Sequence, residues 1–302
     1  PAESRESGQR RIRKETGRGE RAAGGVKMSV QGWKYYNHAM IPDCAPYEEP
    51  DLSALKNGQI WKNVHGVGTP LLARWTTDWD CGHETNWWYC IKDTPVVLED
   101  LRKQSRKDIR KGIGNCEVRI IECAQYVEQL YECYKQAWLH YKNVGEPTSK
   151  EAFAQNCGTN SLIYWAAFEK ESGKLIGYFT VCEHEVYAEI CTAKFYPEYQ
   201  HLQVSAAMYY TVLNHYLEKE NIRFVSSGAR SINHSTQTQD YKERTFGYRK
   251  AYCKLHIEYN PKIKWIINGA YPFRKLLKYL DGFRSAHLLN SVLKMEEIVR
   301  SQ

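Results

Sequence analysis

The chain has 302 residues, of which 42% are apolar and 25% are charged, and its net charge is +7. This composition is typical of a soluble globular protein and argues against a disordered chain or a fibre. No stretch approaches the roughly 20 consecutive apolar residues that span a bilayer, and no charged-then-apolar leader opens the sequence. We therefore expect a cytoplasmic protein that is neither secreted nor integral to a membrane.

The positive charge lies at the two ends of the chain. Residues 1–27 carry a net charge of +4 and residues 261–302 carry +5, so the 233 residues between them carry −2. A dedicated nucleic-acid binder usually has a basic face across its folded domain. We therefore expect no DNA partner, and RNA binding by the folded middle is only a distant third hypothesis.

The ten cysteines do not form a recognisable framework. None belongs to a C-x-x-C pair, and several, such as Cys90, Cys182 and Cys191, fall inside strand-like runs. Scattered cysteines of this kind indicate small buried side chains in a reducing compartment. The spacings of zinc ligands are missing from the sequence, so we expect no metal cofactor.

The first part of the chain is predicted to contain two segments. Residues 1–27 are rich in Arg, Gly and Glu without apolar periodicity, which predicts a disordered basic extension. Patterned sequence starts at Met28, which we expect to be the natural start. Residues 28–115 are expected to form an aromatic-rich subdomain with strands over Leu71–Thr77 and Asn86–Ile91.

A basic helix closes this subdomain. The pattern predicts a helix over Val97–Lys111 that ends at Gly112 and Gly114. Its Lys and Arg residues form two ridges at i, i+4 spacing, and Arg106 and Arg110 belong to one of them. Solvated surface helices usually carry mixed charges, whereas single-sign ridges favour an anionic ligand, and both interpretations stay open.

Residues 116–260 carry a regular alternation of strands and helices. The predicted elements are the strand Cys116–Ile121, the helix Ala124–Tyr141, a helix capped by Ser149, the strands Leu162–Phe168, Leu175–Cys182 and Val186–Lys194, the helix Val204–Lys219, the strand Ile222–Ser226, a short helix near Gln239–Thr245 and the strand Arg249–Tyr259. Short turns join the three middle strands into an antiparallel meander. The helix Val204–Lys219 is long enough to be a crossover, which predicts a parallel strand pair.

This order of elements resembles the GNAT acyltransferase fold, which implies an α/β protein with a mixed sheet. Family members hold the coenzyme A pyrophosphate on backbone amides through a Q/R-x-x-G-x-G/A segment that opens a helix. The corresponding run is Gln200-His201-Leu202-Gln203-Val204-Ser205, where Gln203 and Ser205 replace the glycines. The resemblance implies acyl-CoA as co-substrate, with Gln200, Gln203, Val204 and Ser205 at its phosphates, because helix amino termini attract anions.

A second set of residues is similar to the Fem-type and BioF2-like branch of this superfamily. It comprises the basic helix followed by a strand, and the later Gly228…Tyr241-Lys242-x-x-x-Phe246-Gly247 pattern. The resemblance implies an incomplete GNAT-like half before residue 116. It also implies transfer of an acyl or aminoacyl group to a cell-envelope or polysaccharide precursor, with aminoacyl-tRNA as the alternative donor.

Glu189 is the first candidate for catalysis. Acyl transfer to an amine needs a base near the amine, and Glu189 lies in mid-strand, where a charge is unusual. A period of two places it on a face with Tyr187 and Cys191. A solvated edge glutamate is the alternative. Tyr241 is a candidate acid, and Cys191 as a nucleophile would be a different mechanism.

The loop after Ile222–Ser226 is a candidate substrate site. It contains Arg230, which suits bidentate recognition of phosphate or carboxylate, and His234, which titrates near neutral pH. Lys242 follows on the short helix as a point-charge contact. These residues favour an anionic acceptor with an amino group, such as a sugar nucleotide or a lipid-linked precursor, while a polar surface loop is the alternative.

Two functional hypotheses follow from these residues. The first is an N-acyltransferase that acts on an anionic envelope or polysaccharide precursor. The second is a non-catalytic module that binds a phosphate ligand and retains a degenerate GNAT fold.

The tail Pro261–Gln302 interleaves basic and apolar residues. Pro272 and Gly282 divide it into short amphipathic helices. These helices either pack on the sheet with their cations solvated or lie at an anionic membrane surface, which would make the protein peripheral at the inner face of the membrane.

Overall fold

The computed structural model describes residues 29–30, 32–62, 69–140, 146–159, 161–232, 237–277 and 284–302. The basic extension predicted over residues 1–27 lies outside the described residues. No helix in the described ranges is long and apolar enough to cross a membrane.

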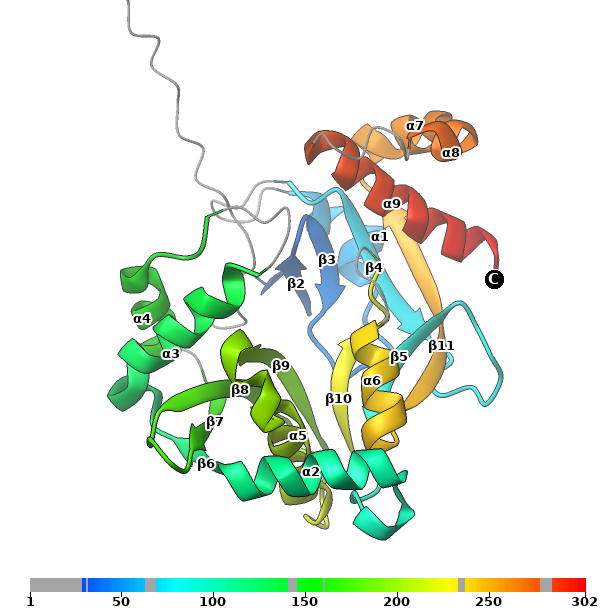
Figure 1. Ribbon diagram of the computed structural model, residues 1–302. Coiled ribbons are helices and arrows are strands. Elements are labelled where there is room, and N and C mark those ends of the chain that lie inside the picture. Colours follow the sequence, from blue (N-terminus) through cyan, green and yellow to red (C-terminus); the bar gives the residue numbers. More distant parts are fainter. Residues whose placement is uncertain are drawn as a thin grey trace, which may run out of the picture.

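In the described part of the chain, one mixed sheet of eleven strands runs through the molecule in the order β1-β2-β3-β4-β11-β5-β10-β9-β8-β7-β6 (Figure 1). The strands are β1 (Ser29–Val30), β2 (Trp33–Tyr36), β3 (Ala39–Pro42), β4 (Leu72–Thr77), β5 (Trp87–Lys92), β6 (Cys116–Ile121), β7 (Ile163–Glu169), β8 (Leu175–Glu183), β9 (Tyr187–Phe195), β10 (Phe224–Ala229) and β11 (Arg249–Tyr259). The late strand β11 lies between the early strands β4 and β5. The strands of residues 29–92 and those of residues 116–259, the two halves of the chain, therefore share one sheet.

The predicted meander and crossover are both confirmed. Strands β6 to β9 pair with their neighbours in antiparallel fashion. Strands β9 and β10 pair in parallel and are joined through α5 (Val204–Leu217). Such a connection needs a dozen or more residues, and α5 supplies them.

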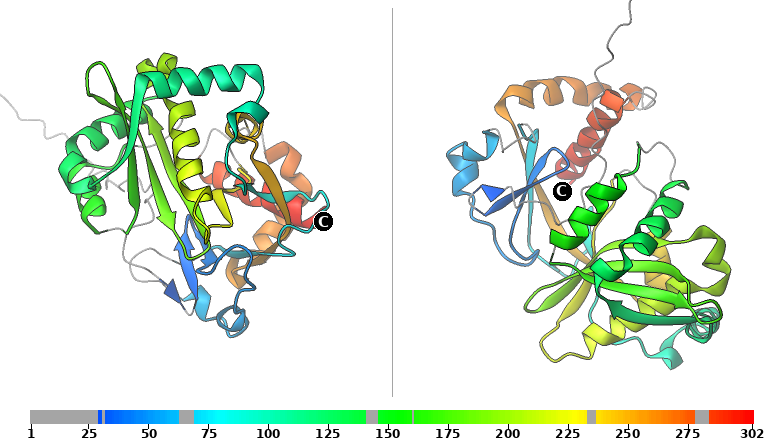
Figure 2. Two further views of the ribbon diagram at one scale, coloured as in Figure 1. Left: turned by 90° about the horizontal axis from the view of Figure 1, so that it is seen from below. Right: turned by 90° about the vertical axis from the view of Figure 1, so that its left-hand side faces the viewer.

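Helices cover both faces of the sheet. They are α1 (Ser53–Lys56), α2 (Lys103–Asn115), α3 (Cys123–Trp138), α4 (Lys150–Thr159), α5, α6 (Gln237–Phe246), α7 (Pro261–Ala270), α8 (Arg274–Leu277) and α9 (Arg284–Arg300), with short 3-10 turns between some of them. Helices α2, α5 and α6 pack on one face around Ala188, Ile190 and Val225. Helices α3, α4 and α9 pack on the opposite face, as the right-hand view of Figure 2 shows in green and red.

The basic helix begins and ends later than the sequence predicts, because Leu98–Asp100 forms a separate 3-10 turn and α2 begins at Lys103 instead of Val97. Gly112 and Gly114 do not end it, because α2 continues to Asn115. At Gly112 the helix touches the first turn of α5. A Cβ atom there would approach the carbonyl oxygen of Gln203 to 2.5 Å and the amide nitrogen of Ala207 to 2.9 Å. Gly112 therefore serves close helix packing.

Substitution of Gly112 tests this contact. Both opposing atoms belong to the backbone and cannot rotate away, so Gly112→Ala should lower the free energy of unfolding by about 1–3 kcal/mol, the usual cost of overpacking. The matched control is Gly114→Ala, two residues along the same helix, where a Cβ meets nothing within 4 Å. That change should stabilise the protein by about 0.5–1 kcal/mol. Urea unfolding measures both, and equal effects would contradict the packing argument.

Candidate functional site

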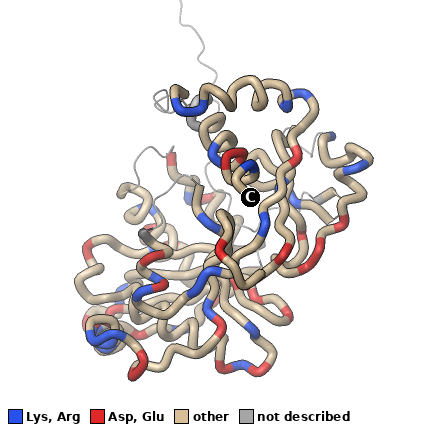
Figure 3. Tube along the Cα trace, turned by 90° about the vertical axis from the view of Figure 1, so that its right-hand side faces the viewer, with Lys and Arg blue, Asp and Glu red and all other residues tan. Residues whose placement is uncertain are grey.

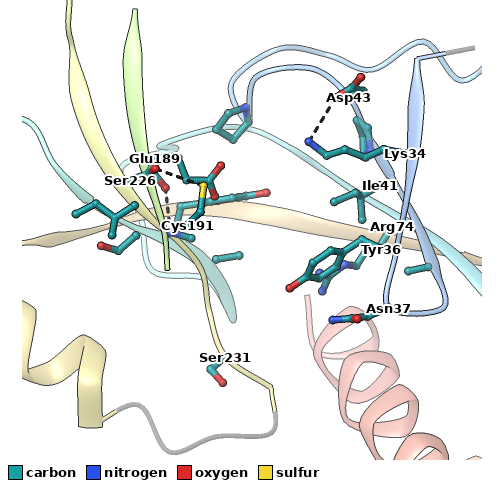
Figure 4. A pocket seen from close by; sticks show the side chains of 18 of the residues that line it. Lys34, Tyr36, Asn37, Ile41, Asp43, Arg74, Glu189, Cys191, Ser226 and Ser231 are labelled. Carbon is teal, nitrogen blue, oxygen red and sulfur yellow. Dashed lines mark hydrogen bonds and ion pairs between the residues drawn. The ribbon is translucent and has the colours of Figure 1, made fainter. Parts of the chain in front are cut away.

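A cleft of about 2090 Å³ opens on the face of the sheet opposite α5. Its walls come from the β2–β3 hairpin, from β4 and β5, from the ends of β9 and β10, and from α3, α4 and α9. Figure 4 shows Glu189, Cys191 and Ser226 on one wall and the side chains of the hairpin and β4 on the other. The cleft therefore joins both halves of the chain.

Strand register explains why the polar residues of the cleft share one side of the sheet. Residues opposite each other on paired strands project to the same face. Ser226 pairs with both Glu189 and Ile91, so β9, β10 and β5 present these residues together. Arg74 of β4 pairs with Ile257 of β11. Alternate residues of β4, Arg74 among them, project to this same face.

The cleft begins where two strands separate. β9 and β10 pair over three positions only, and the last pair is Ser226 with Glu189. Beyond it β10 stays with β5, and β9 stays with β8. The β8–β9 ladder is irregular at Cys191, since Thr180 pairs with Thr192 and Val181 with Ile190. Bulges of this kind are common next to active sites. Glu189 therefore lies at the apex of the opening.

Burial dominates the electrostatics of Glu189. Its neighbours Ala188 and Ile190 face the α5 core, so its carboxylate projects into the cleft, as the period of two predicts. Desolvation raises the pKa of Glu189, and the only opposing influence of note is the positive charge of Lys34. A carboxylate with a raised pKa takes up a proton more readily than a solvated one.

The opposite wall carries positive charge. Lys34 Nζ lies 3.4 Å from a carboxylate oxygen of Asp43. Arg74 has no carboxylate partner among the described residues; its Nη1 lies 4.0 Å from Sδ of Met295, and its guanidinium carbon lies 5.9 Å from the centroid of Trp87. Desolvation lowers the pKa of Arg74, but an arginine keeps its charge in proteins. An anion entering the cleft would therefore find an unpaired cation.

Tyr89 of β5 also lines the cleft. Burial raises its pKa to about 12, and the Glu189 carboxylate contributes to the increase. Its hydroxyl, which forms a hydrogen bond with the side chain of Thr76, therefore keeps its proton at neutral pH.

Cys191 also points into the cleft (Figure 4). Desolvation and the nearby Glu189 carboxylate raise its pKa to about 12. The thiol is therefore protonated at neutral pH and is a weak nucleophile.

The predicted acid and phosphate contacts on α6 lie on the other face of the sheet. Tyr241 lies 3.3 Å, hydroxyl to hydroxyl, from Ser205 of α5. Lys242 is buried, with Nζ 5.4 Å from the ring centroid of Tyr209, and desolvation lowers its pKa. The structure therefore does not bring Tyr241 or Lys242 to Glu189.

Arg230 lies at the rim of the cleft, and its surroundings already engage it. Its guanidinium donates to the carbonyl oxygen of Asn86 at 2.5 Å and lies 4.6 Å from the ring centroid of Trp88. His234 lies outside the described residues.

The predicted cofactor residues do come together at the amino end of α5. Gln203 precedes the helix in the left-handed conformation, with φ of 62°, which is unfavourable for a residue other than glycine. Val204 is fully buried, and α2 covers the first turn through Gly112. Backbone contact with α2 therefore covers part of the turn where the resemblance places the coenzyme A pyrophosphate. Arg106 and Arg110 lie on α2, half-buried and exposed respectively, and Arg106 donates to the carbonyl oxygen of Glu99 at 3.1 Å.

Sequence reasoning missed three residues of the cleft: Lys34, Arg74 and Tyr89. Lys34 belongs to a hairpin whose turn, Asn37-His38, has positive φ at both residues. Asn at such a turn is a known signal, but His at the second position replaces the usual glycine and weakens that signal.

Within the described residues, no three His, Cys, Asp or Glu side chains are grouped as a metal site requires.

The chain is similar to several solved structures, each at low sequence identity. No protein-family model matches the chain, and no curated protein matches it. Among solved structures, the carboxy-terminal DUF2156 domain of a putative lysylphosphatidylglycerol synthetase from Agrobacterium fabrum is similar, with 12% identity, a TM-score of 0.46, and coverage of 79% of this chain and 83% of that one. FemX has 9% identity, a TM-score of 0.46, and coverage of 59% and 63%. A GCN5-related N-acetyltransferase from Sphaerobacter thermophilus has 13% identity, a TM-score of 0.38, and coverage of 63% and 60%.

The predicted α/β architecture with a mixed sheet is confirmed. The described chain has the antiparallel meander and the parallel β9–β10 crossover that the sequence predicted.

The raised pKa of Glu189 predicts a pH-dependent cost to stability. The folded protein binds this proton more tightly than the unfolded chain, in which a glutamate has a pKa of about 4.3. The free energy of unfolding therefore falls as pH rises from that value through the folded pKa, and it stays lower at neutral pH. Glu189→Gln carries no charge, so it should raise the melting temperature at pH 7, with a difference that shrinks toward pH 4.

Thermal denaturation between pH 4 and pH 8 measures this difference. The exposed Glu171→Gln is the matched control and should stay within about 0.5 kcal/mol of wild type at every pH. A wild type more stable than Glu189→Gln at pH 7 would contradict the assignment of a desolvated carboxylate.

Proposed function

We propose that the protein is an acyl- or aminoacyltransferase that modifies an amino group of an anionic acceptor bound in the cleft. The observation that carries this proposal is the position of Glu189, a desolvated carboxylate at the apex of the β9–β10 opening, facing a wall with the unpaired cation of Arg74. A base and an anion-binding group on opposite walls suit an acceptor that has both an amine and a negative charge.

In this mechanism Glu189 takes the proton that the acceptor nitrogen loses as it attacks the carbonyl carbon of the donor. A new C–N bond forms, and the bond from the carbonyl carbon to the leaving sulfur or oxygen breaks. The leaving atom needs a proton, and the hydroxyl of Tyr89 is on the same face of the sheet to supply it. The Glu189 proton can then return to Tyr89 directly or through water.

Arg74 and Lys34 hold the acceptor by its charge. Hydrogen bonds to charged groups are stronger than neutral ones, and a planar guanidinium suits phosphate or carboxylate. A cleft of about 2090 Å³ has room for a sugar nucleotide or for the headgroup of a lipid-linked precursor together with the reacting end of a donor. We therefore propose an envelope or polysaccharide precursor as the acceptor class.

The donor is an acyl-CoA or an aminoacyl-tRNA. The covered first turn of α5 disfavours the usual pyrophosphate position for coenzyme A, which supports testing both donors side by side. The assay incubates the full chain with acetyl-CoA, longer acyl-CoAs or charged tRNA, and with amino-sugar nucleotides or aminolipids as acceptors. Mass spectrometry detects the acylated product. Transfer from either donor supports the proposal, and transfer from neither overturns it.

Glu189→Gln should lower kcat by roughly a hundredfold or more, the usual scale of general-base catalysis. The matched control is Cys191→Ser, which alters the neighbouring side chain of the same wall and should keep most of the activity. If Cys191→Ser lost activity and Glu189→Gln kept it, the mechanism would be nucleophilic catalysis by the thiol.

Arg74→Met should raise KM for an anionic acceptor by roughly ten- to hundredfold, because a hydrogen bond to a charged group contributes about 1.5–3 kcal/mol. For a neutral amine acceptor the KM should change little. Initial rates over a range of acceptor concentrations separate the two. Equal losses with both acceptors would remove Arg74 from recognition of the negative charge.

A second candidate is a binding module without catalysis. The observation behind it is the pair Gln203 and Ser205 in place of glycines, on a helix turn that α2 covers. Calorimetry distinguishes the two candidates. Tight binding of an anionic precursor that Arg74→Met abolishes, with no transfer from any donor, would favour the module.

A further inference from the structure

The segment Pro261–Leu277 exposes an unusual amount of apolar surface. It comprises α7, the 3-10 turn Tyr271–Phe273 and α8, at the top of Figure 1. Nine large apolar side chains are exposed across the described residues, and four of them fall here: Trp265, Ile266, Phe273 and Leu276. Trp265 and Leu276 are each 71% exposed. We call these four residues, with the cations among them, the α7–α8 patch.

The charges of the patch have a single sign. Between Pro261 and Leu277 there are four Lys or Arg residues and no Asp or Glu; Figure 3 shows the blue segments at the top of the tube. Lys264 pairs with Glu258 and Arg274 with Glu297, both outside the segment. Lys262 and Lys275 are exposed and have no ion pair among the described residues.

The patch is fixed to the body of the protein, so its apolar side chains are not exposed by fraying. Asn260 caps α7 by accepting from the amide of Lys262, and its own amide donates to the carbonyl oxygen of Pro70 at 3.1 Å. Ile267 is buried on the inner side of α7. The ring of Tyr271 lies 3.9 Å from the guanidinium carbon of Arg300 on α9.

Helix α9 connects the patch to the cleft. Ile267 of α7 packs in one cluster with Val292 and Leu293 of α9. Val292 and Met295 of α9 also line the cleft, and Met295 contacts Arg74. The patch and the candidate site therefore lie on two sides of one helix.

We infer that the α7–α8 patch binds the surface of a membrane that contains anionic lipid. Trp and Phe side chains favour the headgroup region, and Lys and Arg beside them are attracted to anionic headgroups. A nucleic acid would match the cations but not the exposed Ile266 and Leu276. A protein partner would match the apolar residues but would need acidic groups around them. The inference goes beyond the proposed transferase activity and does not depend on it.

Co-sedimentation of the full chain with vesicles tests the inference. Vesicles of phosphatidylcholine alone are compared with vesicles containing phosphatidylglycerol. The protein should pellet with the anionic vesicles only, and the bound fraction should fall as NaCl is raised, because salt screens surface charges. Recovery in the supernatant with both kinds of vesicle would overturn the inference.

Two variants and a control assign the binding to the patch. Lys262→Glu/Lys275→Glu should weaken binding to anionic vesicles by at least tenfold, and Trp265→Ala/Phe273→Ala should do the same. The control is Leu139→Ala, which removes an equally exposed side chain at the end of α3 and should bind like wild type. All the changed side chains are exposed, so melting temperatures should be unchanged and confirm folding. If both variants bound like wild type, the patch would not be the lipid site.

Two further measurements separate this inference from its alternatives. Analytical ultracentrifugation without lipid should show no self-association through the patch; a dimer that Trp265→Ala/Phe273→Ala dissolves would overturn the inference. Transfer to a water-soluble acceptor should be equal for wild type and Lys262→Glu/Lys275→Glu, so failure of the proposed activity and failure of membrane binding remain distinguishable.

Discussion

The short parallel pairing of β9 with β10 is the constraint on which the rest of the structure depends. A parallel pair cannot be closed by a tight turn, so the chain must cross through α5, which then covers one face of the sheet. The opposite face of the sheet is not covered by α5, and the cleft opens there beyond the last pair, Ser226 with Glu189. Beyond that pair β10 continues along β5, and β9 continues along β8. The cleft is therefore a product of topology, and Glu189 sits in it because of register.

The cleft holds opposite charges on opposite walls without neutralising them. Desolvation disfavours the charged form of Glu189 and of Arg74, raising one pKa and lowering the other. A fold selected for stability alone would pair these groups or replace them with apolar side chains. Keeping them apart is typical of a binding site, where the substrate supplies the missing partners.

Local signals in the sequence predicted the second half of the chain well. The meander from β7 to β9 follows from alternating apolar residues and short turns, and the α4 cap is confirmed by the bond from the amide of Ala152 to Ser149. The predicted end of the basic helix at Gly112 was wrong. This glycine allows close contact with α5, which only the tertiary structure reveals. Propensity alone cannot distinguish a helix-ending glycine from one required by packing.

The candidate site was predicted only in part, for a related reason. The face that Glu189 occupies follows from the strand period, but the other cleft residues come from strands far away in the sequence. In the sequence, nothing distinguishes Arg74 from any other residue of a predicted strand. Tyr241 of α6 and Glu189 of β9 lie on opposite faces of the sheet, so the structure separates them by its thickness. Alternation in the sequence shows which residues of one strand share a face. Only the pairing of strands shows which faces of different strands lie on the same side of the sheet.

The place of β11 between β4 and β5 has a consequence for how the protein folds. Both flanking strands are made more than 150 residues before β11, since β5 ends at Lys92 and β11 begins at Arg249. Until then β4 and β5 each lack a neighbour, and unpaired strand edges invite association with other chains. Contacts of such long range form slowly. Strands β4 and β5 therefore emerge from the ribosome long before β11, and their aromatic-rich edges are exposed to association with other chains until it arrives.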